Sequence, residues 1–175
     1  METLNSKRIF FALWPDDAVR GRLEELLSKL PEDAGRKQVP GDLHLTLEFI
    51  GKASVQHYDC LRMAATRIEF APFAFELVRF GYFPKAKVVS AEPAACQPLT
   101  ELARELRNTL RGCGHTPDKR EYNPHVTLLR KSPPLPWLKP FDPVLWKVDR
   151  FCLVESRESD NSGRRYKVLE EFRAV

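Results

Sequence analysis

The sequence predicts a protein of mixed helices and strands that is built from two similar halves. A His-x-Thr-x tetrapeptide occurs twice, as His44–Leu47 and His125–Leu128. Each copy follows the same order of an apolar strand, an amphipathic helix and a polar loop, and about 33 to 36 residues separate the first strand from each histidine, the size of a strand-helix-strand unit. We therefore expect repeats at 7–51 and 87–131, related by a pseudo-twofold axis, with the two histidine strands facing a central cleft. Chance recurrence of common elements is the alternative.

The first half reads as strand, helix, loop and histidine strand. The compact apolar run 7–14 is typical of a buried strand, and Asp16 or Asp17 can cap the helix that follows. Loop 32–42 is polar and leads to the first histidine strand, which ends at Gly51. The helix should bury the face formed by Val19, Leu23, Leu26, Leu27 and Leu30.

A second helix and a further strand connect the two halves. Ser54 can cap this helix, and His57 is expected on its exposed surface. Residues 73–80 are expected to form a strand, with Gly81 and Pro84 in the turn after it. The apolar face of the helix consists of Tyr58, Leu61, Ala65 and Ile68.

The second half repeats the plan and continues into a C-terminal hairpin. A short strand at 88–91, a third amphipathic helix and loop 115–123 precede the second histidine strand. An extended connector with five prolines follows at 132–143, and alternating apolar residues predict a strand at 144–148 and a hairpin within 151–172. The third helix should bury Leu99, Leu102, Ala103, Leu106 and Leu110, and the connector's Trp137 and Phe141 are expected to pack.

Composition and charge place the chain among globular proteins that act outside the membrane. It is 43% hydrophobic and 30% charged, and its net charge of +4 permits a polyanionic ligand. Residues 1–8 show no secretion signal, and no apolar run is long enough to span a membrane. The four cysteines form no Cys-x-x-Cys pair, so we expect reduced thiols and a cytoplasmic location.

The two motifs carry groups suited to phosphoryl chemistry. Because alternate residues of a strand share a face, His44 and Thr46 lie on one side of their strand, as do His125 and Thr127. An imidazole, with a reference pKa near 6.5, serves as acid or base, and two of them can move protons on opposite sides of a phosphorus atom. A metal site fits poorly, because Glu48 is the one carboxylate expected on a motif face.

At these residues the chain resembles the two-histidine phosphoesterases, and among them the RNA 2′,3′-cyclic phosphodiesterases, also called 2′-5′ RNA ligases. Segments 43–51 and 123–130 are similar to the two family motifs, and 8–12 and 163–166 are similar to its opening and closing segments. Glu48 departs from the small or basic residue expected there. The resemblance implies an α+β fold, one bilobal domain over 1–175, with an antiparallel sheet and outer helices in each lobe.

The resemblance also implies an enzyme that hydrolyses a 2′,3′-cyclic phosphate to a 2′-phosphate without metal or cofactor. By position His44 would be the proton donor to the leaving 3′ oxygen, and His125 would be the acceptor of a proton from water. Thr46 and Thr127 would hold phosphate oxygens, and Arg130 would add a charge-assisted contact. Strict alternation puts Arg130 on the face opposite His125, so it reaches the cleft only if the strand ends or bulges near Leu129; otherwise it is a solvated charge.

The expected partner is RNA with a 2′,3′-cyclic phosphate end, for example a tRNA-like fragment, and no membrane. The reverse reaction would join RNA ends through a 2′-5′ linkage. Two alternatives stay open: the same chemistry on a small molecule such as an ADP-ribose cyclic phosphate, or a non-catalytic RNA-binding module, against which two intact histidines argue. Basic residues near the motifs, which could attract RNA, are Arg36, Lys37, Lys119, Arg120, Arg130 and Lys131.

Overall fold

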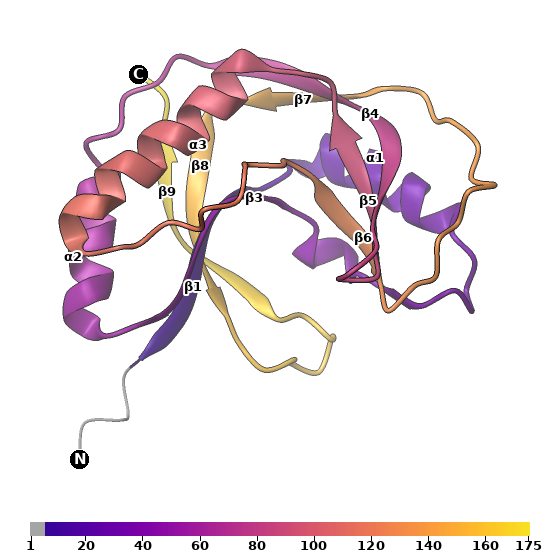
Figure 1. Ribbon diagram of the computed structural model, residues 1–175, viewed down its shortest axis with the longest axis horizontal. Coiled ribbons are helices and arrows are strands. Elements are labelled where there is room, and N and C mark those ends of the chain that lie inside the picture. The colour runs from indigo at the N-terminus through magenta and orange to yellow at the C-terminus, as the bar shows by residue number, and fades with distance from the viewer. Residues whose placement is uncertain (1–5) are drawn as a thin grey trace.

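The computed structural model describes residues 6–175, and in them one antiparallel sheet of nine strands runs through the molecule (Figure 1). Part of the N-terminal segment expected to lack a secretion signal, residues 1–5, lies outside the described residues. The strands are β1 (Lys7–Leu13), β2 (Arg36–Lys37), β3 (Leu45–Ala53), β4 (Phe73–Phe83), β5 (Val88–Pro93), β6 (Val126–Arg130), β7 (Val144–Val148), β8 (Arg150–Ser156) and β9 (Tyr166–Arg173). The helices are α1 (Asp17–Ser28), α2 (Val55–Ala65) and α3 (Gln97–Leu110), with 3-10 turns η1 (Pro40–Asp42) and η2 (Arg111–Cys113).

The strand order divides the sheet into two halves of similar composition. Along the sheet the order is β7-β4-β5-β6-β3-β1-β8-β9. One half of the sheet therefore consists of β7, β4, β5 and β6 and the other of β3, β1, β8 and β9, while β2 pairs with β6 beside this path. The two histidine strands are neighbours at the centre, where Leu45 of β3 pairs with Val126 of β6. Each of these residues directly follows a motif histidine. The predicted α+β architecture of two antiparallel halves around the motif strands is confirmed.

Two of the three helices, α1 and α3, pack across to the other half of the sheet, whereas α2 stays beside β3. Helix α1 follows β1, yet it packs against β7 in the other half, and α3 follows β5 but packs against β3 and α2. Figure 1 shows α2 and α3 together beside β8 and β9, with α1 at the far end of the sheet behind β4 and β5. The core therefore continues between the two halves.

The helix caps and apolar faces agree with the sequence pattern. The Asp16 carboxylate accepts a hydrogen bond from the backbone N–H of Val19 at 2.8 Å, and the Ser54 hydroxyl accepts one from that of His57 at 3.1 Å. These caps satisfy backbone donors that the first helical turns leave unpaired. The buried residues of α1 and α3 are Val19, Leu23, Leu26, Leu27, Leu99, Leu102, Ala103, Leu106 and Leu110.

Local pairing corrects several expectations about loops. The polar loop 32–42 contains β2 and η1, because Arg36 and Lys37 find hydrogen-bonding partners on β6. Strand β4 runs on through Gly81 to Phe83, and the turn begins at Pro84. A Cβ at Gly81 would collide with the side chain of Glu92 on β5, so glycine here allows close approach within the sheet.

Two side chains differ from the predicted exposure. Trp137 of the proline-rich connector is 61% exposed and does not pack, whereas Phe141 is buried against Phe80. His57 is half-buried, and its Nε2 atom is enclosed with no hydrogen-bond partner among the described residues. Within 6–175 no helix has the length and apolar character needed to cross a membrane.

The expectation of four reduced cysteines is wrong for one pair. Cys60 at the exposed side of α2 and Cys113 in η2 form a disulfide, with their Cα atoms 5.7 Å apart. The two cysteines are 53 residues apart in the sequence and come together because α2 packs against α3 and η2. This separation follows no short motif, so the sequence carried no signal for it. Cys96 and Cys152 are free.

Candidate active site

A cleft of about 820 Å³ lies over the junction of β3 and β6. Its lining includes all five residues expected at the site: His44, Thr46, His125, Thr127 and Arg130. The first pair comes from β3 and the residue before it, and the other three come from β6 and the residue before it. The central pairing of β3 with β6 is therefore what brings the two motifs to one place.

The two histidines are oriented in the same way. Nδ1 of His44 lies 2.7 Å from the backbone oxygen of Asp42, and Nδ1 of His125 lies 2.9 Å from that of Asn123. A carbonyl oxygen only accepts, so we assign the proton of each neutral ring to Nδ1. Nε2 of each ring then remains available to take or give a proton.

Aromatic side chains surround His44. Trp14 stacks on its imidazole with ring centroids 5.2 Å apart and an angle of 5° between the planes. Phe10 and Tyr166 each lie 5.0 Å from the ring, Tyr166 edge-on. Burial among these groups lowers the pKa of His44 from 6.5 to about 4, against the raising effect of the Asp42 carbonyl, and the charge of Arg130 lowers it further.

His125 has a less enclosed position in the same cleft. Its ring lies 4.5 Å from that of Phe83. Burial lowers the pKa of His125 as well, while the Asn123 carbonyl and the charge of Glu92 oppose this shift. Both rings are therefore neutral at pH 7 in this structure.

Asp42 connects His44 to the hairpin of β8 and β9. Its buried carboxylate accepts hydrogen bonds from the backbone N–H groups of Arg165 at 2.7 Å and Tyr166 at 3.4 Å. Nε of Arg164 lies 3.5 Å from the same carboxylate. Asp42 therefore holds both the His44 ring, through its carbonyl, and the Tyr166 ring that packs on it. The sequence reasoning missed this residue, although Asp42 and Asn123 occupy the same position two residues before each motif histidine.

A β-bulge brings Arg130 to the cleft. In the pairing of β5 with β6, Val89 is opposite Leu129 and Ser90 is opposite Thr127, so Leu128 is an extra residue. Leu128 and Leu129 are both fully buried, and Arg130 returns to the side of Thr127. The strand therefore has the bulge near Leu129 that Arg130 needs to reach the cleft.

An equivalent bulge in β3 explains the direction in which the side chain of Glu48 points. Ala12 of β1 is opposite Thr46 and Phe11 is opposite Glu48, so Leu47 is the extra residue. Phe11 is a core residue, and Glu48 turns with it toward α3 and away from the side of Thr46. The expectation that alternation places Glu48 on the motif face is therefore wrong.

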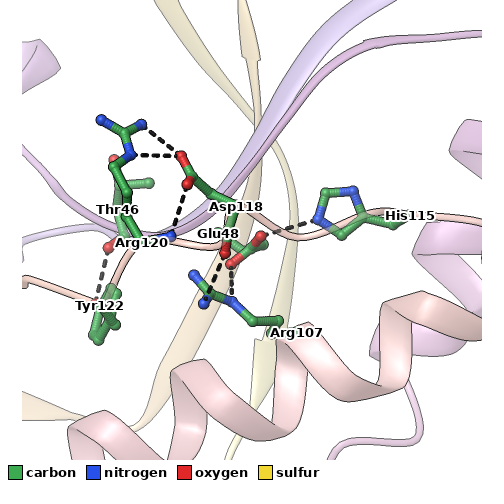
Figure 2. A network of polar contacts seen from close by, with 7 residues as sticks. All are labelled: Thr46, Glu48, Arg107, His115, Asp118, Arg120 and Tyr122. Atoms are coloured by element: carbon green, nitrogen blue, oxygen red, sulfur yellow. Dashed lines mark hydrogen bonds and ion pairs between the residues drawn. The ribbon is translucent and has the colours of Figure 1, made fainter.

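Glu48 anchors the segment that leads to His125 (Figure 2). Its carboxylate lies 2.9 Å from Nε of Arg107 on α3 and 2.9 Å from Nε2 of His115 in the following loop. The hydroxyl of Tyr122 donates to the backbone oxygen of Thr46 at 2.9 Å, and burial, with the nearby Glu48 charge, raises the pKa of that hydroxyl. These contacts attach both ends of loop 114–123 to β3 and so help to position the second motif.

The cleft thus combines two imidazoles, two hydroxyls and one guanidinium. Imidazoles transfer protons, while hydroxyl and guanidinium groups donate hydrogen bonds to phosphate oxygens. Two neighbouring strands, β3 and β6, each bring one imidazole and one hydroxyl, and β6 also brings the guanidinium. Fold and site together define an enzyme of the two-histidine phosphoesterase class.

Comparisons with known proteins identify the family. A model described as the 2′-5′ RNA ligase superfamily matches residues 15–160. The RNA 2′,3′-cyclic phosphodiesterase of Thermus thermophilus is 33% identical over 94% of this chain and 89% of its own length, and that of Escherichia coli is 31% identical over 72% and 73%. The crystal structure of E. coli LigT complexed with 3′-AMP matches with a TM-score of 0.89 at 28% identity and covers 98% of this chain and 99% of that one. The chain belongs to the 2′-5′ RNA ligase superfamily.

Proposed function

We propose that the protein is an RNA 2′,3′-cyclic phosphodiesterase that opens the cyclic phosphate to a 2′-phosphate. The observation that carries this proposal is the pair of imidazoles in one cleft, each with Nδ1 directed to a carbonyl oxygen and Nε2 left for the substrate. Relatives from Thermus thermophilus and Escherichia coli bear this activity in their names. Both halves belong to one catalytic domain under this proposal, because each supplies one histidine.

The two histidines divide the proton transfers. Nε2 of His125 accepts a proton from the attacking water, and His44 donates one to the 3′ oxygen as its bond to phosphorus breaks. The water oxygen becomes the new phosphate oxygen, and the 3′ hydroxyl is restored. His44 is neutral at pH 7 in this structure, and the negative charge of an entering phosphodiester favours its protonation.

The remaining cleft residues stabilise the phosphate. The hydroxyls of Thr46 and Thr127 donate to its non-bridging oxygens, and Arg130 balances the charge that develops on them. The Glu48 carboxylate, which is part of the cleft lining, already binds Arg107 and His115. We therefore propose catalysis without a metal or nucleotide cofactor, and full activity in EDTA is the expected result.

The direct test is hydrolysis of oligonucleotides that end in a 2′,3′-cyclic phosphate, beside mononucleoside and ADP-ribose cyclic phosphates. His44→Ala and His125→Ala should each lower turnover roughly 10²- to 10⁴-fold while leaving the protein folded. Near-native turnover by either variant would contradict two-histidine catalysis. Hydrolysis of the ADP-ribose cyclic phosphate alone would show that the substrate is a small molecule and not RNA.

A sulfur substrate separates the roles of the histidines. A 3′-thiolate leaves readily without protonation, so a 3′-thio cyclic phosphate should restore much of the rate lost in His44→Ala but not that lost in His125→Ala. Restoration of His125→Ala instead would reverse the assignment.

The same proposal covers the reverse reaction and the cellular setting. An RNA 5′ hydroxyl in place of water would form a 2′-5′ linkage, which incubation of cyclic-phosphate and 5′-hydroxyl ends would reveal. We propose that the enzyme acts in the cytoplasm on RNA ends such as those of tRNA-like fragments. Thiol trapping in intact cells tests this location, because the Cys60–Cys113 disulfide would be reduced in the cytoplasm.

A further inference from the structure

The proposed chemistry leaves unexplained an exposed aromatic residue in the cleft. Phe49 is 52% exposed, although it lies on a central strand and lines the cleft. It pairs across the sheet with Phe10, whose ring lies 5.0 Å from that of His44. Phe10 therefore links the exposed ring of Phe49 to His44, the proposed proton donor.

Phe49 and Arg130 occupy equivalent positions after the two motif histidines. Phe49 lies five residues after His44, and Arg130 lies five residues after His125. A bulge precedes each of them, at Leu47 and at Leu128, and both side chains line the cleft. One half of the molecule therefore has a cation for the phosphate at this position, whereas the other half has a bare aromatic ring.

Arg8 stands beside this ring. Its guanidinium carbon lies 5.2 Å from the centroid of Phe49, and Arg8 forms no ion pair with any residue of 6–175. Arg8 also lines a shallow second groove, together with Lys7, Lys52 and Arg157. Part of that groove's positive charge is balanced, because Arg157 binds Glu155 at 2.9 Å. An aromatic face with an unpaired guanidinium is the combination that binds a nucleobase and a backbone phosphate.

We propose that Phe49 and Arg8 form a nucleotide-binding subsite for the RNA end. The base of the terminal nucleotide stacks on Phe49, while Arg8 contacts the phosphate on the 5′ side of the same nucleotide. The strand then leaves the cleft over the groove lined by Lys7 and Lys52. This inference rests on the proposed function and adds to it a preference for RNA ends over cyclic phosphates that lack a base or a 5′ phosphate.

The test compares Phe49→Ala with Phe49→Tyr and with Trp137→Ala, which removes an exposed aromatic residue outside the cleft. On a cyclic-phosphate dinucleotide, Phe49→Ala should raise KM about 5- to 100-fold with kcat nearly unchanged, the range expected for one stacked base. Phe49→Tyr and Trp137→Ala should behave like the wild type. On an abasic ribose 2′,3′-cyclic phosphate, Phe49→Ala and the wild type should be equal.

Arg8→Gln tests the second contact. It should lower kcat/KM for the dinucleotide, and this loss should shrink with added salt. It should have no effect on a mononucleoside cyclic phosphate with a free 5′ hydroxyl. An Arg8→Gln variant that is equally impaired on both substrates would contradict the phosphate contact.

Two outcomes separate this inference from the function on which it rests. If the wild type hydrolyses the dinucleotide and Phe49→Ala matches Trp137→Ala, the subsite is wrong and the function stands. If the wild type hydrolyses no cyclic phosphate, the function is wrong. Calorimetric binding of adenosine 3′-phosphate then decides the subsite, because equal affinity in wild type and Phe49→Ala would overturn it.

Discussion

Removal of Trp14 should change the titration of His44 in a way that tests the site without any substrate. Burial lowers the pKa of His44 from 6.5 to about 4, which corresponds to a preference of roughly 3 kcal/mol for the neutral ring. Among residues 6–175, Trp14 is the one ring that stacks face to face on His44, with centroids 5.2 Å apart. Trp14→Ala admits water to that face, and we expect the pKa of His44 to rise by about one pH unit or more.

The measurement is NMR of the imidazole Cε1–H signals between pH 3 and 8, with the His44 signal assigned through His44→Gln. In the wild type this signal should titrate with a midpoint of about 4. Trp137→Ala, which changes an exposed tryptophan outside the cleft, should leave the midpoint unchanged. A wild-type midpoint near 6.5, or equal midpoints in wild type and Trp14→Ala, would refute the desolvation argument.

The lowered pKa of His44 also determines how the free energy of unfolding changes with pH. In the unfolded chain His44 has its ordinary pKa of 6.5, so between pH 6.5 and about 4 the unfolded state binds more protons than the folded state. His44 therefore contributes stability above this window, and the contribution is lost as pH falls through it. Below about pH 4 the loss levels off. Chemical denaturation of wild type and Trp14→Ala across this range should show a weaker dependence in the variant.

Four further substitutions test other parts of the site and fold. Glu48→Gln breaks a buried ion pair and should cost about 3 kcal/mol in urea unfolding, whereas a cost below about 1 kcal/mol would contradict the anchoring role. Thr46→Val and Thr127→Val each remove a hydrogen-bond donor, and each should weaken transition-state stabilisation, measured from kcat/KM, by about 1–3 kcal/mol. Unchanged kinetics in both variants would mean that the threonines have only a structural role. Cys60→Ser opens a cross-link between residues 53 apart and should lower the unfolding free energy by roughly 4 kcal/mol under oxidising conditions. The same variant should match the wild type in a strong reductant, and a difference there would point to lost packing.

Local patterns predicted the elements well because local physics forms them. The face of α1 that contains Val19 and Leu23 repeats at helical spacing, and its Asp16 cap is a neighbour in the chain. The two histidines were found for the same reason, because strand alternation places each beside its threonine and the motif recurs. These inferences needed no knowledge of which elements touch.

What the sequence could not predict depends on contacts between distant segments. The bulge that brings Arg130 into the cleft exists only in the register between β5 and β6. Glu48 finds its role when α3 delivers Arg107, 59 residues later in the chain. The Cys60–Cys113 disulfide likewise requires α2 to pack near the end of α3. Periodicity says that a helix has a buried face, but it does not say which half of the sheet that face will cover.

The exchange of helices between the halves has a consequence for folding. Helix α1 covers β7 and α3 covers β3, so neither half keeps a closed core when the other is removed. The half of the sheet formed by β3, β1, β8 and β9 also takes its strands from both ends of the chain. Fragments cut between α2 and β4 should therefore not fold separately, and the intact chain should unfold in one cooperative transition and not lobe by lobe. The positions of the two imidazoles are then set by a shared core without a hinge, and the cleft keeps its geometry until the whole molecule unfolds.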